Sequence, residues 1–331
     1  MASYYSVHAG PLKKELLQYL DRDVLRKLHQ RDPWRHFLIT VRQFFILVGA
    51  TLGLIHFKNP LIWIPLAFVQ GFTVFNFTVL LHEVVHNTVF RPGPWSRRWN
   101  KFLGYLYAFP SGMSPTQFTR WHLDHHAQLG SEEADPKRHH LSPKKNRRII
   151  KLLYFTPALF PIYFRAARAE TATYPEHLQK TIQRERRFAM FFHLICAGLC
   201  YGFGGPGVLL RVYLIPVFFI FPIAFGLNRL GQHYNIKPDD PAQWSTLVRS
   251  SLWWNFWFLN SNFHLEHHYF PGVPFYHLPK LHRLLQPFYQ KKGMKAYGYG
   301  ELFYRYVIQN CPPHADWERM VKPASVTSSA A

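Results

Sequence analysis

The chain has 331 residues, of which 48% are hydrophobic, and its 39 Lys and Arg outnumber its 18 Asp and Glu, giving a formal net charge of +21 at pH 7. The sequence contains no recognised nucleic-acid-binding motif, so we expect no nucleic-acid partner, and a surface facing anionic lipid headgroups explains the charge better. The only cysteines, Cys196, Cys200 and Cys311, exclude a disulfide framework and a metal site built from thiolates.

Four apolar segments predict helices that cross a membrane. Residues 37–57 contain one charge, Arg42, and residues 61–81 contain none, and each segment is about the length that a helix needs to span a bilayer. A second apolar pair, 188–203 and 208–227, is separated by the sequence Gly-Gly-Pro-Gly. Four buried helices of a large soluble domain are the alternative, but core helices rarely run so far without a polar face.

The positive charge indicates how these helices are oriented. Lys and Arg are almost absent from the two apolar pairs and their connecting loops, and they concentrate before, between and after the pairs. By the positive-inside rule, the charged segments lie on the cytoplasmic side. We therefore expect one all-α integral membrane domain over residues 1–331, divided into a cytoplasmic N-terminal segment (1–36), a first membrane hairpin (37–81), a cytoplasmic segment (82–187), a second membrane hairpin (188–228), a cytoplasmic segment (229–315) and a disordered tail (316–331).

Histidines gather next to the cytoplasmic ends of the apolar segments. On a helix, positions i, i+3 and i+4 share one face, so the pattern H-x-x-H-H directs three imidazoles toward one point and H-x-x-x-H directs two. Of the 20 histidines, nine fall in such clusters or just after the last apolar segment: His82 and His86 in LLHEVVHN, His122, His125 and His126 in RWHLDHHAQLG, His233 in LGQHYNI, and His264, His267 and His268 in SNFHLEHHYFPGVP.

Nine imidazoles indicate a site for two metal ions. A zinc site uses about four ligands, whereas nine suit two ions with five or six ligands each, and imidazole is a good ligand for iron. An intramembrane zinc metalloprotease is the main alternative, because His82, Glu83 and His86 also fit the H-E-x-x-H pattern. That interpretation leaves the other three clusters without a role.

Taken together, the boxes His82-x-x-x-His86, His122-x-x-His125-His126 and His264-x-x-His267-His268 resemble those of the membrane fatty-acid desaturase superfamily. That family also includes hydroxylases and ketolases acting on lipids and carotenoids. The resemblance implies four transmembrane helices in two hairpins, with a cytoplasmic, histidine-rich helical cap that holds a non-haem diiron centre. It assigns the eight box histidines and His233 as ligands. Some relatives carry an asparagine one turn before that last histidine, but this chain has Arg229 there, next to Asn228, so no asparagine ligand is assigned.

The resemblance also implies an activity, namely the O2-dependent desaturation of a fatty-acyl chain in a membrane lipid or acyl thioester. A lipid or carotenoid hydroxylase or ketolase on the same scaffold is the alternative. The sequence lacks the His-Pro-Gly-Gly signature of a fused haem domain, and its third box opens with His264 rather than glutamine. We therefore expect electrons from a separate donor such as cytochrome b5 or ferredoxin. The expected location is a bacterial inner membrane or the endoplasmic reticulum, with the histidines facing the cytoplasm.

Residues beside the boxes are candidates for supporting roles. The carboxylates of Glu83, Asp124 and Glu266 are placed to orient ligand imidazoles through the second ring nitrogen, or to face solvent. Residues 152–164 are too short to span a bilayer and predict an interfacial helix, with a buried packing helix as the alternative. Aromatic residues near the boxes are candidates for the wall of an acyl channel or for interfacial anchors: Phe75, Phe77, Trp121, Trp253, Trp254, Phe256, Trp257 and Phe258.

Overall fold

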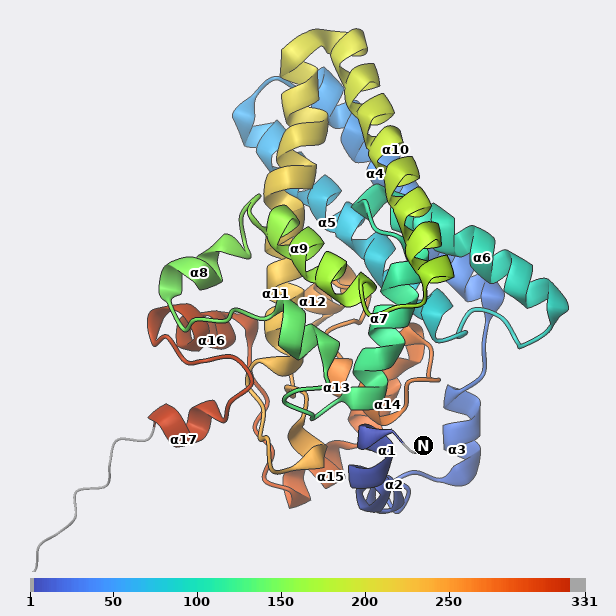
Figure 1. Cartoon of the computed structure of the whole chain (residues 1–331), viewed down its shortest axis with the longest axis vertical. Coiled ribbons are helices and arrows are strands. Elements are labelled where there is room, and N and C mark those ends of the chain that lie inside the picture. The colour runs from blue at the N-terminus through green and yellow to red at the C-terminus, as the bar shows by residue number, and fades with distance from the viewer. Residues whose placement is uncertain (1–2, 322–331) are drawn as a thin grey trace, which may run out of the picture.

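The computed structural model describes residues 3–321, and those residues form helices and loops but no β-strand, as the sequence predicts. Figure 1 shows long helices at one end of the molecule and a cap of shorter helices at the other. The chain begins in this cap with α1 (Tyr4–His8), α2 (Gly10–Leu16) and α3 (Arg22–Leu28).

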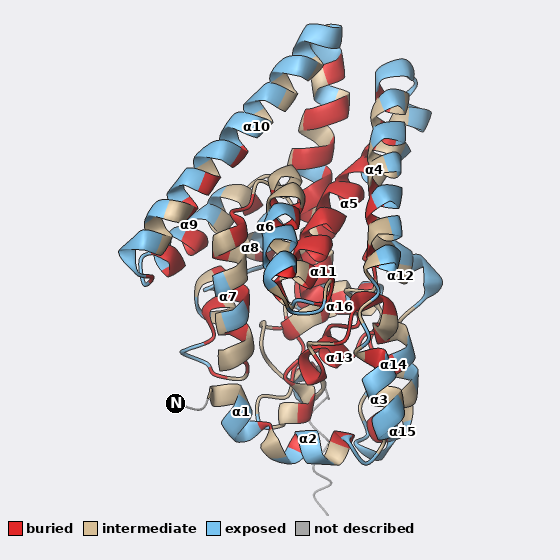
Figure 2. Ribbon diagram, turned by 90° about the vertical axis from the view of Figure 1, so that its right-hand side faces the viewer, coloured by how far each residue is buried: buried red, intermediate tan, exposed pale blue. Residues whose placement is uncertain are grey.

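The first two long helices, α4 (Pro33–His56) and α5 (Pro60–Val85), form a hairpin. Each helix starts with a proline. Proline has no backbone N–H, but at the first position of a helix that group would have no partner within the helix. The side chains of Asp32 and Asn59 cap the two helices by accepting backbone N–H groups of the first turns. Figure 2 shows α5 buried at the centre and α4 exposed at the edge. The inner end of α5 therefore carries His82 into the middle of the protein.

The second hairpin is a stretch of 58 residues made of α10 (Glu176–Val208), the π-helical η3 (Leu209–Ile220) and α11 (Phe221–His233), and it is interrupted by a kink. The backbone is not helical at Gly204 and Gly205, and Gly205 has a φ of +65°, which glycine adopts readily. Figure 1 shows the chain turning back here, so that the return limb packs against α10. Within residues 3–321, three helical stretches are long and apolar enough to cross a membrane, namely α4, α5 and this one, whereas the sequence predicts four separate helices.

The outer faces of α4 and α10 expose large apolar side chains. Phe45 and Leu52 on α4 and Phe191 and Phe203 on α10 all have more than half of their surface exposed. Figure 2 shows both helices exposed over much of their length. A continuous apolar surface of this kind is unfavourable in water and well suited to lipid chains, so the long helices are those of a membrane protein.

The remaining helices form the cap. Between the hairpins lie α6 (Pro94–Ala108), η1 (Phe109–Ser111), α7 (Pro115–Gln128), η2 (Lys137–Leu141), α8 (Arg148–Leu153) and α9 (Leu159–Thr171). After the second hairpin lie η4 (Pro241–Gln243), α12 (Leu252–Trp257), α13 (His264–Tyr269), η5 (Phe275–His277), α14 (Leu278–Leu284), α15 (Gln286–Lys291), α16 (Tyr299–Phe303), η6 (Tyr304–Ile308) and α17 (Trp317–Val321).

Two local expectations differ from the structure. The interfacial helix expected at 152–164 is divided between α8 and α9, because Pro157 disfavours helical geometry at the residue before it. The first residues of the tail expected to be disordered, 316–331, instead form α17 (Trp317–Val321), because Trp317 is fully buried and its indole N–H donates to the carbonyl of Pro312. Residues 322–331 of that predicted tail lie outside the described residues.

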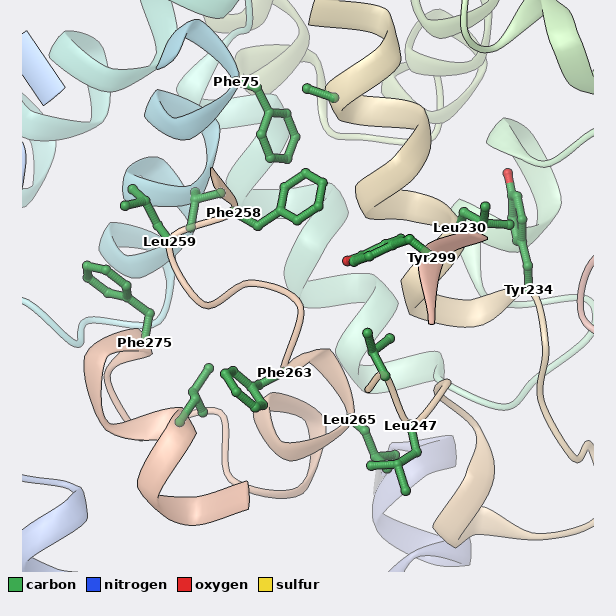
Figure 3. Packing of buried hydrophobic residues seen from close by; sticks show 14 of the residues in the cluster. Phe75, Leu230, Tyr234, Leu247, Phe258, Leu259, Phe263, Leu265, Phe275 and Tyr299 are labelled. Atoms are coloured by element: carbon green, nitrogen blue, oxygen red, sulfur yellow. The ribbon is translucent and has the colours of Figure 1, made fainter. Parts of the chain in front are cut away.

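An aromatic core connects the inner end of α5 with the C-terminal part of the cap. Figure 3 shows Phe75 of α5 above Phe258, with Tyr299 beside them. The ring of Phe258 lies 5.8 Å from that of Phe75, edge to face, and 5.3 Å from that of Tyr299, measured between centroids. Such pairs contribute roughly 0.5–1.5 kcal/mol each beyond the burial of their surface. They fix the position of the segment that leads into α13.

Candidate metal centre

Four helices bring the nine predicted histidines together. The histidines lie at the C-terminal end of α5, along α7, at the C-terminal end of α11 and on α13. Their ring nitrogens form two groups, and within each group the potential ligand atoms all lie within 4.8 Å of one another. The first group has five members, His82, His86, His122, His126 and His267, and the second has four, His125, His233, His264 and His268.

In the second group, hydrogen bonds at Nδ1 determine which nitrogen carries the proton in two of the rings. Nδ1 of His125 lies 2.8 Å from Oδ1 of Asp135, and Nδ1 of His233 lies 2.9 Å from the carbonyl oxygen of Trp244. Both partners are acceptors, so each Nδ1 carries the proton and each Nε2 presents a lone pair. The two Nε2 atoms are nevertheless only 3.1 Å apart. Neutral rings in this arrangement repel each other unless a cation lies between them.

The other two members of this group complete the convergence. Nε2 of His264 lies 2.9 Å from Nε2 of His233 and 3.0 Å from Nε2 of His268. All four rings are buried. Burial, followed by the neighbouring histidines, holds the pKa values of His264 and His268 well below the usual 6.5. These rings are therefore neutral near pH 7, which is the form that binds a metal ion.

The first group is arranged in the same way. Nε2 of His86 lies 2.8 Å from Nε2 of His122, and Nε2 of His267 lies 3.0 Å from Nε2 of His126. Nε2 of His82 is buried without a hydrogen-bond partner among the described residues. A buried polar atom without a partner is costly, and a metal ion at the centre of the group would satisfy it. The donor set thus fits a metal ion in each group.

Glu83 is held in place by its neighbours. Its Oε2 accepts hydrogen bonds from Oγ1 of Thr88 at 2.6 Å and from the backbone N–H of Phe275 at 3.0 Å, and its Oε1 lies 3.4 Å from Nδ1 of His82. The carboxylate therefore ties the end of α5 to the chain after α13. A protease base must be free to take a proton from water, so these contacts disfavour the zinc protease interpretation.

The other two predicted carboxylates pair with groups outside the nine histidines. Asp124 pairs with Arg120 at 2.9 Å. Glu266 lies 2.5 Å from Nδ1 of His282, a residue that the sequence does not link to the site, and 2.6 Å from the hydroxyl of Tyr289. Glu266 thus anchors α13 to α14 and α15 rather than orienting a box histidine.

Two orienting groups, Asp135 and the carbonyl of Trp244, are not predicted from the sequence. Asp135 is buried, and its Oδ1 also accepts the backbone N–H of Lys137 at 2.9 Å. Its position directly before Pro136, in the loop after the second box, is the only signal for it in the sequence. A backbone carbonyl such as that of Trp244 leaves no signal at all.

Lys137 lies beside the first group. Its Nζ is 2.9 Å from Nδ1 of His122. Burial, followed by the nearby charge of Arg229, lowers the pKa of Lys137 to about 7. In its neutral form the amine can accept a hydrogen bond from the N–H at Nδ1 of His122, which leaves Nε2 of that histidine with a lone pair for a metal ion.

A cavity lies directly beside the histidines. His82, His122, His264 and His267 form part of its wall, and most of the rest is apolar or aromatic. Of the eight aromatic residues predicted as channel wall, Phe75 and Trp121 line this cavity and the other six do not.

The positions of those six aromatic residues explain the difference. Phe77 is fully buried and packs 4.9 Å from Phe44 between ring centroids, and Trp257 packs 5.2 Å from Phe72. Trp253 is exposed, as is Phe256, which agrees with the alternative role of interfacial anchors. Trp254 and Phe258 stack on each other with their centroids 5.5 Å apart.

The sequence profile of the fatty acid desaturase family matches residues 59–299. This range covers more than half of the chain and contains all nine histidines of the two groups. The chain therefore belongs to the fatty acid desaturase family.

Curated relatives are distant and act on different lipids. The chain is 27% identical over 288 residues to the chloroplastic omega-3 fatty acid desaturase of Glycine max, covering 79% of this chain and 62% of that protein. It is 23% identical over 326 residues to the sphingolipid delta(4)-desaturase of Xenopus tropicalis, covering 95% and 93%. It is 26% identical over 220 residues to the sphingolipid delta(4)-desaturase/C4-monooxygenase of Mus musculus, covering 64% and 62%. The chain thus spans less than two thirds of the first and third of these proteins.

Proposed function

We propose that the chain is a membrane-bound desaturase that introduces a double bond into a fatty-acyl chain of a membrane lipid or acyl thioester, at a centre of two iron ions held by the nine histidines. The observation that carries this proposal is the pair of converging imidazole groups, with five and four members, beside one largely apolar cavity. Imidazole is a good ligand for iron. Membership of the desaturase family and the names of the relatives support lipid oxidation.

The reaction removes one hydrogen atom from each of two neighbouring methylene carbons. With O2, two electrons from a donor and two protons, the products are a carbon–carbon double bond and two molecules of water. When bound, the two irons supply the oxidising power for this step, which no amino-acid side chain has. The remaining work belongs to the protein, which must hold the ligand rings and the acyl chain in position.

The side chains around the site perform that work. Asp135 and the carbonyl of Trp244 keep the protons of His125 and His233 on Nδ1, so that both Nε2 atoms remain free to bind metal. The apolar cavity wall, including Phe75 and Trp121, holds the hydrocarbon chain and keeps water from the reacting carbons. No residue is assigned as a catalytic acid or base beyond the metal centre.

Hydroxylation is the second candidate function. The relative from Mus musculus is named both as a desaturase and as a C4-monooxygenase. Transfer of one oxygen atom to the first carbon, in place of removal of the second hydrogen, gives an alcohol from the same starting geometry. The products of the reaction distinguish the two functions.

The proposal includes a topology and a partner. The four limbs of the two hairpins cross the membrane, and the cap with the histidines faces the cytoplasm, in agreement with the positive-inside rule. The electron donor is a separate protein, such as cytochrome b5 or a ferredoxin. The strongly basic chain suits an acidic partner.

The test combines the metal content of the purified chain with the lipid profile of cells that express it. We expect two irons per chain and new unsaturated lipids. New hydroxylated lipids would favour the second candidate. One zinc per chain with unchanged lipids would contradict both and restore the protease interpretation.

Substitutions extend this test to each histidine group. His267→Ala in the first group and His125→Ala in the second are expected to abolish lipid oxidation while leaving membrane insertion intact. His139→Ala is the control, because this histidine is exposed and belongs to neither group. Full activity in either of the first two variants would refute the ligand assignment.

A further inference from the structure

A buried arginine without an acidic partner lies in the wall of the cavity. Arg229 of α11 is only 6% exposed. Its Nε donates to the hydroxyl of Tyr234 at 3.2 Å, and its Nη2 donates to the carbonyl of Lys137 at 3.1 Å and to Oγ of Ser142 at 3.2 Å. These partners are neutral. Among residues 3–321, no hydrogen bond engages its Nη1 and no carboxylate forms an ion pair with it.

The nearby carboxylates are already committed to other groups. Asp135 accepts from His125 and from two backbone N–H groups of the same loop. Glu83, which also lines the cavity, is held by Thr88 and by the chain after α13. An arginine keeps its charge in proteins, and a buried charge is stable only when it is paired. The protein itself thus leaves the positive charge of Arg229 unbalanced.

The same wall carries neutral polar side chains. Asn228 donates to Oγ of Ser261 at 2.7 Å, and Gln232 donates to Oδ1 of Asn228 at 2.6 Å. All three side chains line the cavity together with Arg229. Phe75, with other apolar residues, forms the remaining wall. The cavity therefore has a polar, positively charged patch, although a hydrocarbon segment alone would require only apolar walls.

This inference rests on the proposed function. We propose that the patch binds an oxygen acceptor at the head of the substrate, a carboxylate or a carbonyl, with Arg229 as its main contact. Arg229 donates to the carbonyl of Lys137, whose Nζ lies 2.9 Å from Nδ1 of His122, and Arg229 and His122 line the same cavity. A head group bound by Arg229 therefore lies close to the histidines. The carbons that react are then near the head of the acyl chain rather than near its middle or its methyl end.

Binding of short probes tests the patch without any turnover. The purified full-length chain is titrated calorimetrically with octanoate, N-methyloctanamide and 1-octanol, which share a chain length and differ in the head. We expect octanoate to bind about tenfold more tightly than the alcohol, as an added charge-assisted hydrogen bond allows. Equal binding of octanoate and the amide would identify a carbonyl as the recognised group. Equal binding of all three probes would refute the proposal.

Three variants distinguish a role of Arg229 in binding the head group from a purely structural role. Arg229→Gln is expected to lose the preference for octanoate. Ser142→Ala removes one neutral partner of Arg229 but leaves the charge of Arg229 in place. This variant is therefore expected to retain the preference for octanoate. Arg168→Gln is the control for a change of charge, because Arg168 is exposed on α9. Loss of the preference in Ser142→Ala, or its retention in a folded Arg229→Gln, would show that Arg229 acts only as a structural residue.

The position of the new double bond provides a second, independent test. In lipids from cells that express the chain, we expect the double bond near the head of the acyl chain and a lower yield with Arg229→Gln. A double bond in the distal half of the chain, with an unchanged yield in the variant, would refute the head-group site and leave the desaturase assignment standing. A preference for octanoate in a chain that yields no oxidised lipid would refute the desaturase assignment and leave the head-group site standing.

Discussion

At the scale of single residues, the site depends on which nitrogen of each ring carries its proton. An imidazole binds a metal ion through a lone pair, so a ligand that uses Nε2 needs its proton on Nδ1. Asp135 ensures this for His125, and the carbonyl of Trp244 ensures it for His233. Because Asp135 is itself buried and accepts backbone N–H groups, its orientation is fixed by the loop.

We predict that Asp135→Asn lowers iron binding. Asparagine can still accept the hydrogen bond from Nδ1 of His125 but lacks the negative charge that strengthens it. Substitution of such a partner to a metal-bound histidine weakens metal binding by about 10- to 100-fold. The measurement is the iron content of the purified variant in a titration with a chelator. Asp124→Asn is the matched control, since Asp124 pairs with Arg120 and not with a histidine. Equal iron retention in the two variants would contradict the orienting role.

At the scale of helices, the site depends on how closely α5 approaches the return limb of the second hairpin. Gly71 of α5 lies against η3, where a Cβ atom would come within 2.5 Å of Cβ of Ile220 and 2.8 Å of the backbone oxygen of Pro216. The buried side chain of Gln70 also donates to the carbonyl of Val212. This close contact holds together the two helices that carry His82 and His233.

We predict that Gly71→Ala destabilises the protein by roughly 1–3 kcal/mol, because overpacking forces the two helices apart. Gly198→Ala on α10 is the control, since its Cβ would meet no atom within 4 Å. Alanine at an open helical position is expected to be neutral or to stabilise by about 0.5–1 kcal/mol. Unfolding of both variants by denaturant, in the same detergent, gives the comparison. A Gly71→Ala variant as stable as the control would show that the helices are not closely packed here.

At the scale of the whole molecule, the sequence predicts what depends on local pattern. The four apolar segments predict an all-helical fold. The spacing of the histidines predicts the nine candidate ligands, which the structure brings together. The division of these histidines into five and four depends on how α7 crosses α11 and α13. It places His125 with His233 but His126 with His267, although His125 and His126 are neighbours in one box.

Other features depend on contacts between distant segments and are therefore absent from the local pattern. The sequence predicts that the acidic residues inside the boxes either orient ligand imidazoles or face solvent, yet Asp124 and Glu266 pair with Arg120 and His282. A loop supplies the orienting carboxylate of Asp135. Likewise, Trp317 orders a segment of polar composition through burial against Tyr306, with their ring centroids 6.1 Å apart. Such partners become visible only when the chain is folded.

The proposed topology predicts which positions of the chain are accessible from each side of the membrane. In a variant with its three cysteines replaced by serine, new cysteines are introduced at exposed positions of the two turns, Lys58→Cys and Gly207→Cys, and of the cap, Arg97→Cys and His139→Cys. The turns and the cap lie at opposite ends of the long helices. If all four limbs cross the bilayer, a membrane-impermeant thiol reagent labels the two turn positions only from the side of the membrane opposite the cytoplasm, and the two cap positions only from the cytoplasmic side. Labelling of Lys58→Cys and Arg97→Cys from the same side would mean that α5 does not cross the membrane. The histidine groups would then require a different orientation.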